Sequence, residues 1–362
     1  MHILFLNQYF PPDPAPTGLL MKEVAEALES DGHTVDFVST RENYHASQHK
    51  GKRIFREAKA LAWMLLSGIS RRRPDVVISA TSPPCLLVVA SIIAKRYRAK
   101  SIHWIMDVYP EIAVATNRLR QGVIVSAIER VMRWCYRKCT HVVVLDTDMA
   151  NLLRGYRVDA KIIRPWVVNS VTDVHNDIAR PSLPWVWIYS GNLGLGHEWK
   201  TILQTQALVE QQCPEIRLLF QGGGPMWPAA QAWARELGLR HCDWKPYVPP
   251  EKLCESLLRC HCCVASQLPD TQGLIWPSKL SLLLALRRPM IWIGPLNGAI
   301  AAELRSLRHV GVFAPGEERE IAKWILDLRS QGGQTISTGE IFDAESFRAA
   351  SIEMWRKLVS FS

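Results

Sequence analysis

The chain has 362 residues, 48% hydrophobic and 21% charged, a composition that excludes a disordered or collagen-like protein. This length exceeds one ordinary hydrophobic core and favours about two domains. The formal net charge of +9 favours an anionic partner, such as a phosphorylated small molecule, an anionic membrane surface or nucleic acid.

The start of the chain and its cysteines indicate the compartment. The first residues, MHILFLN, lack the basic leader of a signal peptide, and no apolar run reaches the roughly 18 residues that span a bilayer. The nine cysteines are irregularly spaced, which favours a reducing compartment over a disulfide framework. We therefore expect a cytoplasmic protein. The cysteines around His261 leave a metal site open, but their spacing matches no zinc pattern, and buried thiols are the favoured interpretation.

Strands and helices alternate through the first half of the chain. Strand-like runs at 2–10 and 34–39 flank a helical run at 19–29, which predicts a βαβ unit and hence a parallel sheet. Further strands are expected at 75–80, 101–106, 141–145 and 161–168. Ligands of such sheets gather at the carboxyl ends of the strands, where Gly18 and Asp107 would lie. An Asp in that place either faces the ligand or caps the next segment.

The second half opens on a short apolar strand at 185–189, a glycine-rich segment at 190–197 and a helical run at 198–209. Glycines let the backbone approach a ligand, and a helix start offers unpaired N–H groups and a partial positive charge. The arrangement predicts a phosphate site, to which His197 would add a hydrogen-bond donor or a charge. A connection without a ligand is the alternative.

Glycines also follow the next strand. The run 216–220 predicts a strand that leads into Gly222, Gly223 and Gly224. Later strands are expected at 241–247, 262–266 and 290–293, and helices at 229–237, 299–304, 318–330 and 344–359. The stretch 169–184 is polar, contains two prolines and has no periodicity, so it predicts a linker between two α/β domains.

Two segments combine an apolar face with basic flanks, 52–73 and 125–138. Such helices bind anionic membranes, which would make the protein peripheral on the inner face of the plasma membrane. The alternative is a domain helix with a solvated basic end. Aromatic residues are not interleaved with the basic ones as a single-strand platform requires, so nucleic-acid binding is not expected.

Six residue strings occur in one order along nearly the whole chain. They are YFPP at 9–12 with Thr17-Gly18, TSPP at 81–84, DVYPE at 107–111, SGNLG at 190–194 with His197, GGGP at 222–225 and PSKL at 277–280. In this order they resemble the family 4 glycosyltransferases, most of all the branch that builds bacterial surface polysaccharides such as O-antigen and colanic acid. The resemblance implies an α/β fold of GT-B architecture, with two facing Rossmann-like domains, parallel sheets and an interdomain cleft.

The resemblance also implies a division of labour. Residues 1–168 would bind the acceptor, with the C-terminal helix at 344–362 packing back onto them, and residues 185–343 would bind a nucleotide sugar. A sugar would pass from a UDP or GDP donor, with retention and with neither metal nor other cofactor, to a glycan or a polyprenyl-phosphate-linked acceptor. The implied donor-binding residues are Gly18, Gly191, Asn192, His197, Gly222, Gly223, Gly224, Tyr247, Gln272, Gly273, Leu274, Ser278 and Lys279.

The chain departs from the family's pattern in its donor domain. Many members carry Arg and Lys where this chain has Asn192 and His197, which keeps hydrogen-bond donors but reduces the charge. Many members also carry two Glu eight positions apart, where this chain has Leu274 and Leu282. Lys279 and its neighbours are expected to take over, because an ammonium meets a diphosphate as a point charge.

The implied catalytic residues are Asp107, His197 and Lys279. Negative charge develops on the departing diphosphate, and helix-start N–H groups, His197 and Lys279 would compensate it. Positive charge develops on the sugar ring, where Asp107 would stabilise it or orient a hydroxyl. Many family members have a His–Asp pair there. In this chain Met106 replaces the His, which leaves Asp107 as the ionisable group.

Two other functions stay open. The missing Glu pair suggests a catalytically silent nucleotide-sugar-binding protein, and a nucleotide-sugar epimerase also uses two facing α/β domains. The epimerase would need several ionisable groups in its site, and the sequence offers few. The donor base, the sugar, the linkage, the acceptor and the oligomeric state do not follow from the sequence.

Overall fold

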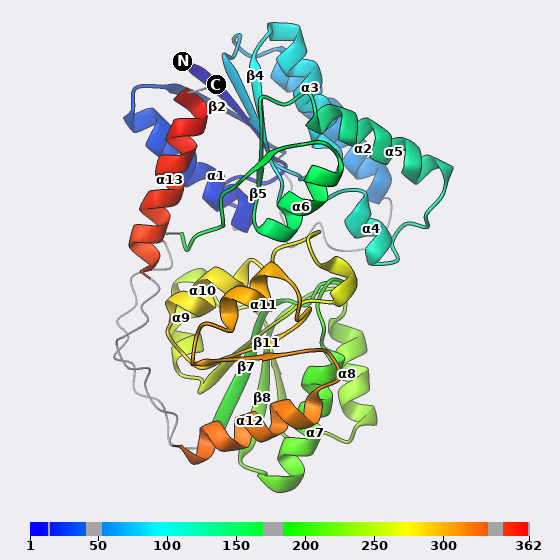
Figure 1. Ribbon diagram of the computed structural model, residues 1–362, viewed down its shortest axis with the longest axis vertical. Coiled ribbons are helices and arrows are strands. Elements are labelled where there is room, and N and C mark those ends of the chain that lie inside the picture. The colour runs from blue at the N-terminus through cyan, green and yellow to red at the C-terminus, as the bar shows by residue number, and fades with distance from the viewer. Residues whose placement is uncertain (14, 41–52, 169–183, 332–342, 361–362) are drawn as a thin grey trace. The chain divides into compact units, whose positions relative to one another are not determined.

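The computed structural model describes residues 1–13, 15–40, 53–168, 184–331 and 343–360 (Figure 1). Apart from Pro184, the linker expected at 169–184 lies outside the described residues. The chain divides into two compact units: an N-terminal unit of Met1–Trp166, Gly273–Trp276 and Glu345–Ser362, and a C-terminal unit of Val167–Gln272 and Pro277–Ala344. The expected division kept all of 185–343 together, whereas Gly273–Trp276 folds with the N-terminal unit.

The N-terminal unit is built on a parallel sheet with the order β2-β1-β3-β4-β5-β6. Its strands are β1 (His2–Leu6), β2 (Thr34–Val38), β3 (Val76–Ser79), β4 (Lys100–Trp104), β5 (His141–Val144) and β6 (Ala160–Ile162). Its helices are α1 (Pro16–Ser30), α2 (Arg53–Ile69), α3 (Leu86–Tyr97), α4 (Glu111–Ala115), α5 (Val123–Tyr136), α6 (Thr147–Gly155) and α13 (Ala344–Ser360). Strand β1 pairs on both sides and is buried along its length, which explains its unbroken apolar sequence.

All six strands of this sheet are shorter than expected, and two of them, β1 and β6, lose the most. Strand β1 ends at Leu6 because the Asn7 side chain donates a hydrogen bond to the Tyr9 carbonyl at 2.6 Å and turns the chain toward the prolines. Strand β6 ends at Ile162, short of Pro165, which has no N–H to donate to a ladder. Both basic segments do form helices, α2 and α5. Within the described ranges, no helix is both long and apolar enough to cross a membrane.

The C-terminal unit repeats the plan with a parallel sheet in the order β12-β11-β10-β7-β8-β9. Its strands are β7 (Trp185–Asn192), β8 (Ile216–Gly223), β9 (Cys242–Lys245), β10 (Cys262–Ser266), β11 (Met290–Ile293) and β12 (Val310–Phe313). Its helices are α7 (Lys200–Gln212), α8 (Trp227–Glu236), α9 (Pro250–Leu258), a 3-10 helix (Pro269–Thr271), α10 (Lys279–Ala285), α11 (Ala299–Leu304) and α12 (Glu318–Ser330). Strand β12 was not expected, because its four residues include a glycine and its second half is only partly buried.

The C-terminal helix α13 packs within the N-terminal unit, although it is last in the chain. Trp355 is fully buried, and its ring lies 4.6 Å from that of Trp104. Arg348 pairs with Glu23 on α1 at 2.7 Å. Helix α13 therefore completes the core of a domain whose other strands and helices come almost entirely from the first 166 residues.

We expect Trp355→Ala to destabilise the N-terminal unit by about 3–5 kcal/mol, because the substitution leaves a large cavity in the core. The neighbouring Met354 is 42% exposed, so Met354→Ala is expected to change stability by no more than about 0.5 kcal/mol. Urea unfolding followed by tryptophan fluorescence and circular dichroism measures both. Equal unfolding midpoints for the two variants would show that α13 is not part of the core.

Candidate functional site

The carboxyl ends of β7 and β8 approach each other through glycines. Gly191 pairs with Gly222, and both have positive φ, +122° and +139°. A Cβ on Gly222 would lie 2.2 Å from the Gly191 carbonyl oxygen, and a Cβ on Gly224 would lie 2.4 Å from Asn192 Oδ1. No side chain fits at these positions. Gly191, Gly222 and Gly223 were expected in turns but continue the strands, which leaves bare backbone at this edge.

Lys279, the first residue of α10, lies beside this edge. Its Nζ is 3.3 Å from the centre of the Tyr189 ring and 3.5 Å from the place of a Cβ on Gly191. The residue is partly exposed, but the nitrogen itself is buried and has no hydrogen-bond partner among the described residues. Burial holds the pKa of Lys279 well below its ordinary value. An anionic group at this edge would favour the charged form of the amine and supply the acceptor that the described residues do not.

Asn192 and His197 flank the loop that follows β7. A Cβ on Gly194 would contact His197 Cδ2 at 3.5 Å and Asn192 Nδ2 at 3.6 Å. The other amide atom, Asn192 Oδ1, is buried and unpartnered within the described part of the chain. The structure thus brings Asn192, His197 and Lys279 together, since the charge of Lys279 also acts on the His197 ring.

The protonation of His197 differs from the expectation. Its Nδ1 lies 2.9 Å from the Ser266 carbonyl oxygen, which only accepts hydrogen bonds, so Nδ1 carries the proton. Burial, and then the neighbouring Lys279, lower the pKa of His197 to about 3, so the ring is neutral at physiological pH. Its Nε2 presents a lone pair. The neutral ring can accept a hydrogen bond there, but it supplies neither the expected donor nor the expected charge.

The start of α7 also differs from the expectation. The helix begins at Lys200, and the Glu198 side chain accepts a hydrogen bond from the Thr201 amide at 2.8 Å. Glu198 is buried, so its carboxylate holds the place that was expected for a phosphate. The remaining candidate anion-binding groups of this region are therefore Lys279 and the backbone of the glycine edge.

The remaining donor-site candidates of the C-terminal unit are less enclosed. Tyr247 is 41% exposed, and its ring would touch a Cβ on Gly223 at 3.0 Å, so it borders the glycine edge. Ser278 is exposed and precedes Lys279 at the start of α10, where its side chain makes no capping bond. Gln272 is exposed and is the last residue before the chain enters the N-terminal unit.

Gly18, Gly273 and Leu274 have packing roles in the N-terminal unit. A Cβ on Gly18 would lie 2.8 Å from the Tyr9 carbonyl oxygen, which requires glycine early in α1. Gly273 has a φ of +69° and packs against Asp148. The Leu274 carbonyl accepts a hydrogen bond at 2.8 Å from the amide next to Asp107 in the chain. The predicted donor-binding role of these three residues remains a prediction.

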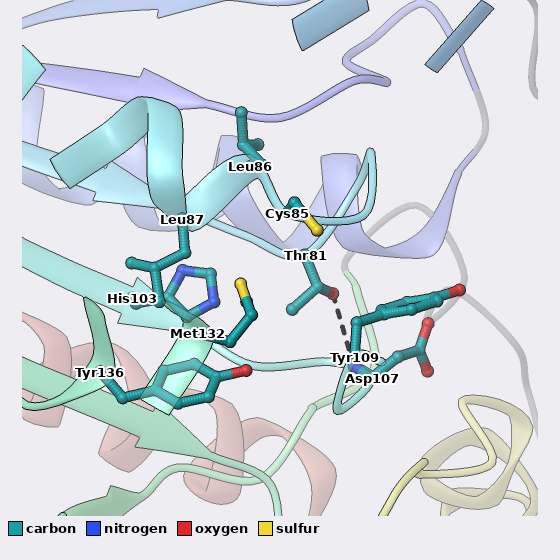
Figure 2. A pocket seen from close by; sticks show the side chains of 9 residues that line it. All are labelled: Thr81, Cys85, Leu86, Leu87, His103, Asp107, Tyr109, Met132 and Tyr136. Carbon is teal, nitrogen blue, oxygen red and sulfur yellow. Dashed lines mark hydrogen bonds between the residues drawn. The ribbon is translucent and has the colours of Figure 1, made fainter. Parts of the chain in front are cut away.

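Asp107 lines a small pocket of the N-terminal unit (Figure 2). Its amide donates a hydrogen bond to Thr81 Oγ1 at 3.4 Å. Burial raises the pKa of Asp107 to about 6, which brings its titration near physiological pH.

The same pocket contains His103, so Asp107 is not the only ionisable group there. His103 Nδ1 lies 2.8 Å from Ser79 Oγ, and burial lowers the pKa of this histidine to about 3. We therefore expect a neutral ring. The sequence analysis considered only Met106, the residue directly before Asp107. It missed His103 because this residue lies inside β4, three positions before Met106.

The cysteine-rich segment is structural. His261 Nδ1 accepts a hydrogen bond from the Val186 amide at 3.0 Å, and its ring stacks on Trp185 at 5.2 Å. The cysteines on either side of His261 are buried. Among the residues with described positions, no group of three or more His, Cys, Asp or Glu could hold a metal ion.

Two residues of the site were missed by sequence reasoning. Tyr189 provides the ring under Lys279 Nζ, and Ser266 fixes the tautomer of His197. Trp185, Trp187 and Tyr189 alternate along β7 and share its buried face, so a period-two pattern could have marked Tyr189 as a core residue beside the glycines.

The chain is similar to known glycosyltransferases. Residues 18–167 match the model of Glycosyltransferase Family 4. A probable glycosyltransferase, WbjE of Pseudomonas aeruginosa, is 23% identical over 284 residues, which are 72% of this chain and 69% of that protein.

Solved structures show the same architecture. A sucrose-phosphate synthase from Thermosynechococcus elongatus (13% identity) and HepE of Anabaena with UDP-glucose (15% identity) each match with a TM-score of 0.66, over 100% of both chains. A putative UDP-N-acetylglucosamine 2-epimerase from Listeria monocytogenes gives a TM-score of 0.55 at 12% identity, over 99% of this chain and 97% of its own. These comparisons confirm the resemblance to family 4 glycosyltransferases and the GT-B fold.

We expect Gly224→Ala to destabilise the C-terminal unit more than Gly238→Ala does. Both glycines have positive φ, so each substitution carries a backbone penalty of roughly 1–2 kcal/mol. Nothing lies within 4 Å of a Cβ on Gly238, whereas a Cβ on Gly224 collides with Asn192 and with the Leu193 backbone. Thermal unfolding of the two variants measures the difference. Equal losses would mean that the loop after β7 can move aside freely.

Proposed function

We propose that this chain is a retaining glycosyltransferase of surface polysaccharide biosynthesis. It takes a sugar from a UDP- or GDP-linked donor and passes it to a glycan or a polyprenyl-phosphate-linked acceptor. The observation that carries the proposal is the buried Lys279 Nζ, which has no acceptor among the described residues and lies beside the glycine edge of β7 and β8. HepE, which has the same fold, was solved with UDP-glucose, and WbjE is named a probable glycosyltransferase.

Lys279 would compensate the charge of the departing diphosphate. Breaking the bond between the anomeric carbon and the phosphate oxygen leaves the electron pair, and hence negative charge, on the nucleotide diphosphate. An ammonium fixed in a dry site stabilises that charge without reorganising, and one such interaction is worth about 3 kcal/mol in the transition state. The bound anion in turn favours the charged ammonium and opposes the effect of burial on the pKa of Lys279.

Bare backbone suits the rest of the diphosphate. The glycines at 191 and 222–224 let phosphate oxygens or the nucleoside come within contact of main-chain atoms. His197 Nε2 would accept a hydrogen bond from a donor-sugar hydroxyl, since its neutral ring has only a lone pair to offer there. Asn192 carries both a donor and an acceptor at the same edge.

Asp107 would serve the reacting sugar. Its carboxylate form would stabilise positive charge that develops on the ring, or would orient an attacking hydroxyl. Burial favours the protonated form and so raises its pKa to about 6, which leaves the carboxylate predominant at neutral pH.

The donor site is tested with Lys279→Met, which keeps the length of the stem and removes the charge. We expect this variant to bind UDP and GDP at least about tenfold more weakly than wild type, measured by calorimetry and by ligand-induced thermal shift. Wild-type affinity should also fall as pH rises, because the anion needs a protonated Lys279 whose pKa is already low. This pH dependence should disappear in Lys279→Met.

The matched control is Lys200→Met, on the exposed start of α7. It removes the same charge near the same strands but should leave the affinity and its pH dependence unchanged. If both lysine variants bind the nucleotides as wild type does, Lys279 does not hold the diphosphate.

Asp107→Asn tests the second catalytic candidate. Wild-type kcat should fall as pH drops below about 6, because the carboxylate becomes protonated there. The amide variant should lower kcat by about a hundredfold or more and should lose this acid limb, with donor affinity unchanged. A wild-type acid limb that persists in Asp107→Asn would assign the titration to another group.

Product analysis separates the proposed transferase from the two alternatives. The transferase gives a free nucleoside diphosphate and a glycosylated acceptor, the epimerase gives a changed nucleotide sugar, and a silent binding protein gives neither. Transfer with retention is expected to continue in the presence of EDTA. The silent alternative is favoured by Leu274 and Leu282, which stand where many family members carry Glu.

A further inference from the structure

Helices α2 and α5 each pack against α3, so the three helices form one surface of the N-terminal unit. Gly68 lets α2 approach α3 closely, since a Cβ there would lie 2.4 Å from Ile93 Cδ1. The Tyr97 hydroxyl ties the end of α3 to α2 by donating a hydrogen bond to the Ile69 carbonyl. We call this surface the α2/α3/α5 face.

The outward side of this face is apolar. On α2, exposed residues recur every three or four positions, and they include Phe55, Trp63 and Leu66. Phe55 is 77% exposed and Trp63 is 46% exposed. The opposite side of the same helix carries Met64, which is buried in the core. Helix α2 therefore has two apolar sides, and packing in the core explains only one of them.

The neighbouring helices continue the pattern. Ile92 is the exposed apolar residue of α3. On α5, Ile124 is 78% exposed at the helix start and Trp134 is 52% exposed a few turns later. Large hydrophobic residues gathered on adjoining helices, with an indole on each outer helix, indicate a surface that is covered in use.

The exposed charges on these helices have one sign. Exposed basic residues border the face on all three helices and their ends: Lys59, Arg71, Arg72, Arg73, Lys95, Arg96, Arg98, Arg130, Arg137 and Lys138. The described residues of the three helices include no exposed Asp or Glu. Glu57 on α2 and Glu129 on α5 are partly buried, and Glu129 pairs with Arg133 at 3.4 Å. The partner must therefore be apolar in its interior and negative at its surface.

We propose that the α2/α3/α5 face docks on an anionic lipid bilayer. Phe55, Leu66 and Ile124 would enter the boundary between headgroups and acyl chains, and the two tryptophans would lie at headgroup depth. The basic border would contact lipid phosphates, each residue adding attraction that salt weakens. A second copy of this chain fits less well, because two such faces would bring like charges together. This inference does not rest on sugar transfer.

Vesicle flotation tests the docking with the full chain. We expect the protein to float with phosphatidylcholine vesicles that contain phosphatidylglycerol, and to remain behind with phosphatidylcholine alone. Raising the salt concentration should lower the bound fraction. Absence of binding to the anionic vesicles would overturn the proposal.

Two double variants separate the apolar and the charged contributions. Trp63→Ser with Trp134→Ser, and Arg130→Gln with Lys138→Gln, should each weaken binding to anionic vesicles by about tenfold or more. These four side chains are exposed, so thermal unfolding should be nearly unchanged.

Matched controls lie on other elements. Lys252→Gln with Arg305→Gln removes the same charge from exposed sites of the C-terminal unit and should bind as wild type does. If the control weakens binding as much as the Arg130 and Lys138 variant, net charge alone attracts the vesicles and the face is not the docking site. If light scattering shows a dimer that the tryptophan variant dissociates, with no effect of that variant on flotation, the face binds a second copy instead.

Discussion

The contact between Gly191 and Gly222 is the constraint on which the candidate site depends. Their backbones lie so close that a Cβ on Gly222 would stand 2.2 Å from the opposite carbonyl oxygen. Glycines near the carboxyl ends of both parallel strands thereby leave the backbone bare, and the Lys279 amine occupies the space beside them against the Tyr189 ring. The C-terminal unit bears the unfavourable burial of that nitrogen, which an anionic ligand would relieve.

Neighbouring groups make the site selective in charge and in hydrogen bonding. The Glu198 side chain accepts a hydrogen bond from the Thr201 amide at the start of α7 and so occupies a group that a phosphate was expected to bind. Ser266 fixes the tautomer of His197, so an acceptor nitrogen faces the same loop as the lysine. One fixed cation and one fixed acceptor suit a ligand that carries both an anionic group and hydroxyls.

The patterns that depend on near neighbours could be read from the sequence. The βαβ alternation predicted two parallel sheets, and the glycines after two strands marked where a ligand could approach the backbone, although they were expected in turns. The missing parts depend on distant partners. The position of the His197 proton is fixed by the Ser266 carbonyl, 69 residues away. The hydrogen bond of Glu198 to the Thr201 amide forms because α7 begins at Lys200, a boundary that the sequence did not define. The apolar face also needed the structure, because only the packing of α3 joins the two basic helices into one surface.

The segment Gly273–Trp276 affects how the protein can be dissected. The chain passes between the two units at 166/167, 272/273, 276/277 and 344/345. A fragment cut at 185 and 343 would carry away four residues that complete the other unit, including the Leu274 carbonyl that receives the Val108 amide. The severed N-terminal piece would also lose α13 and its buried indole. Neither unit is one continuous stretch of the chain. To exchange the N-terminal unit with that of a related chain, the segment 273–276 and the last helix would have to be transferred together with the first 166 residues.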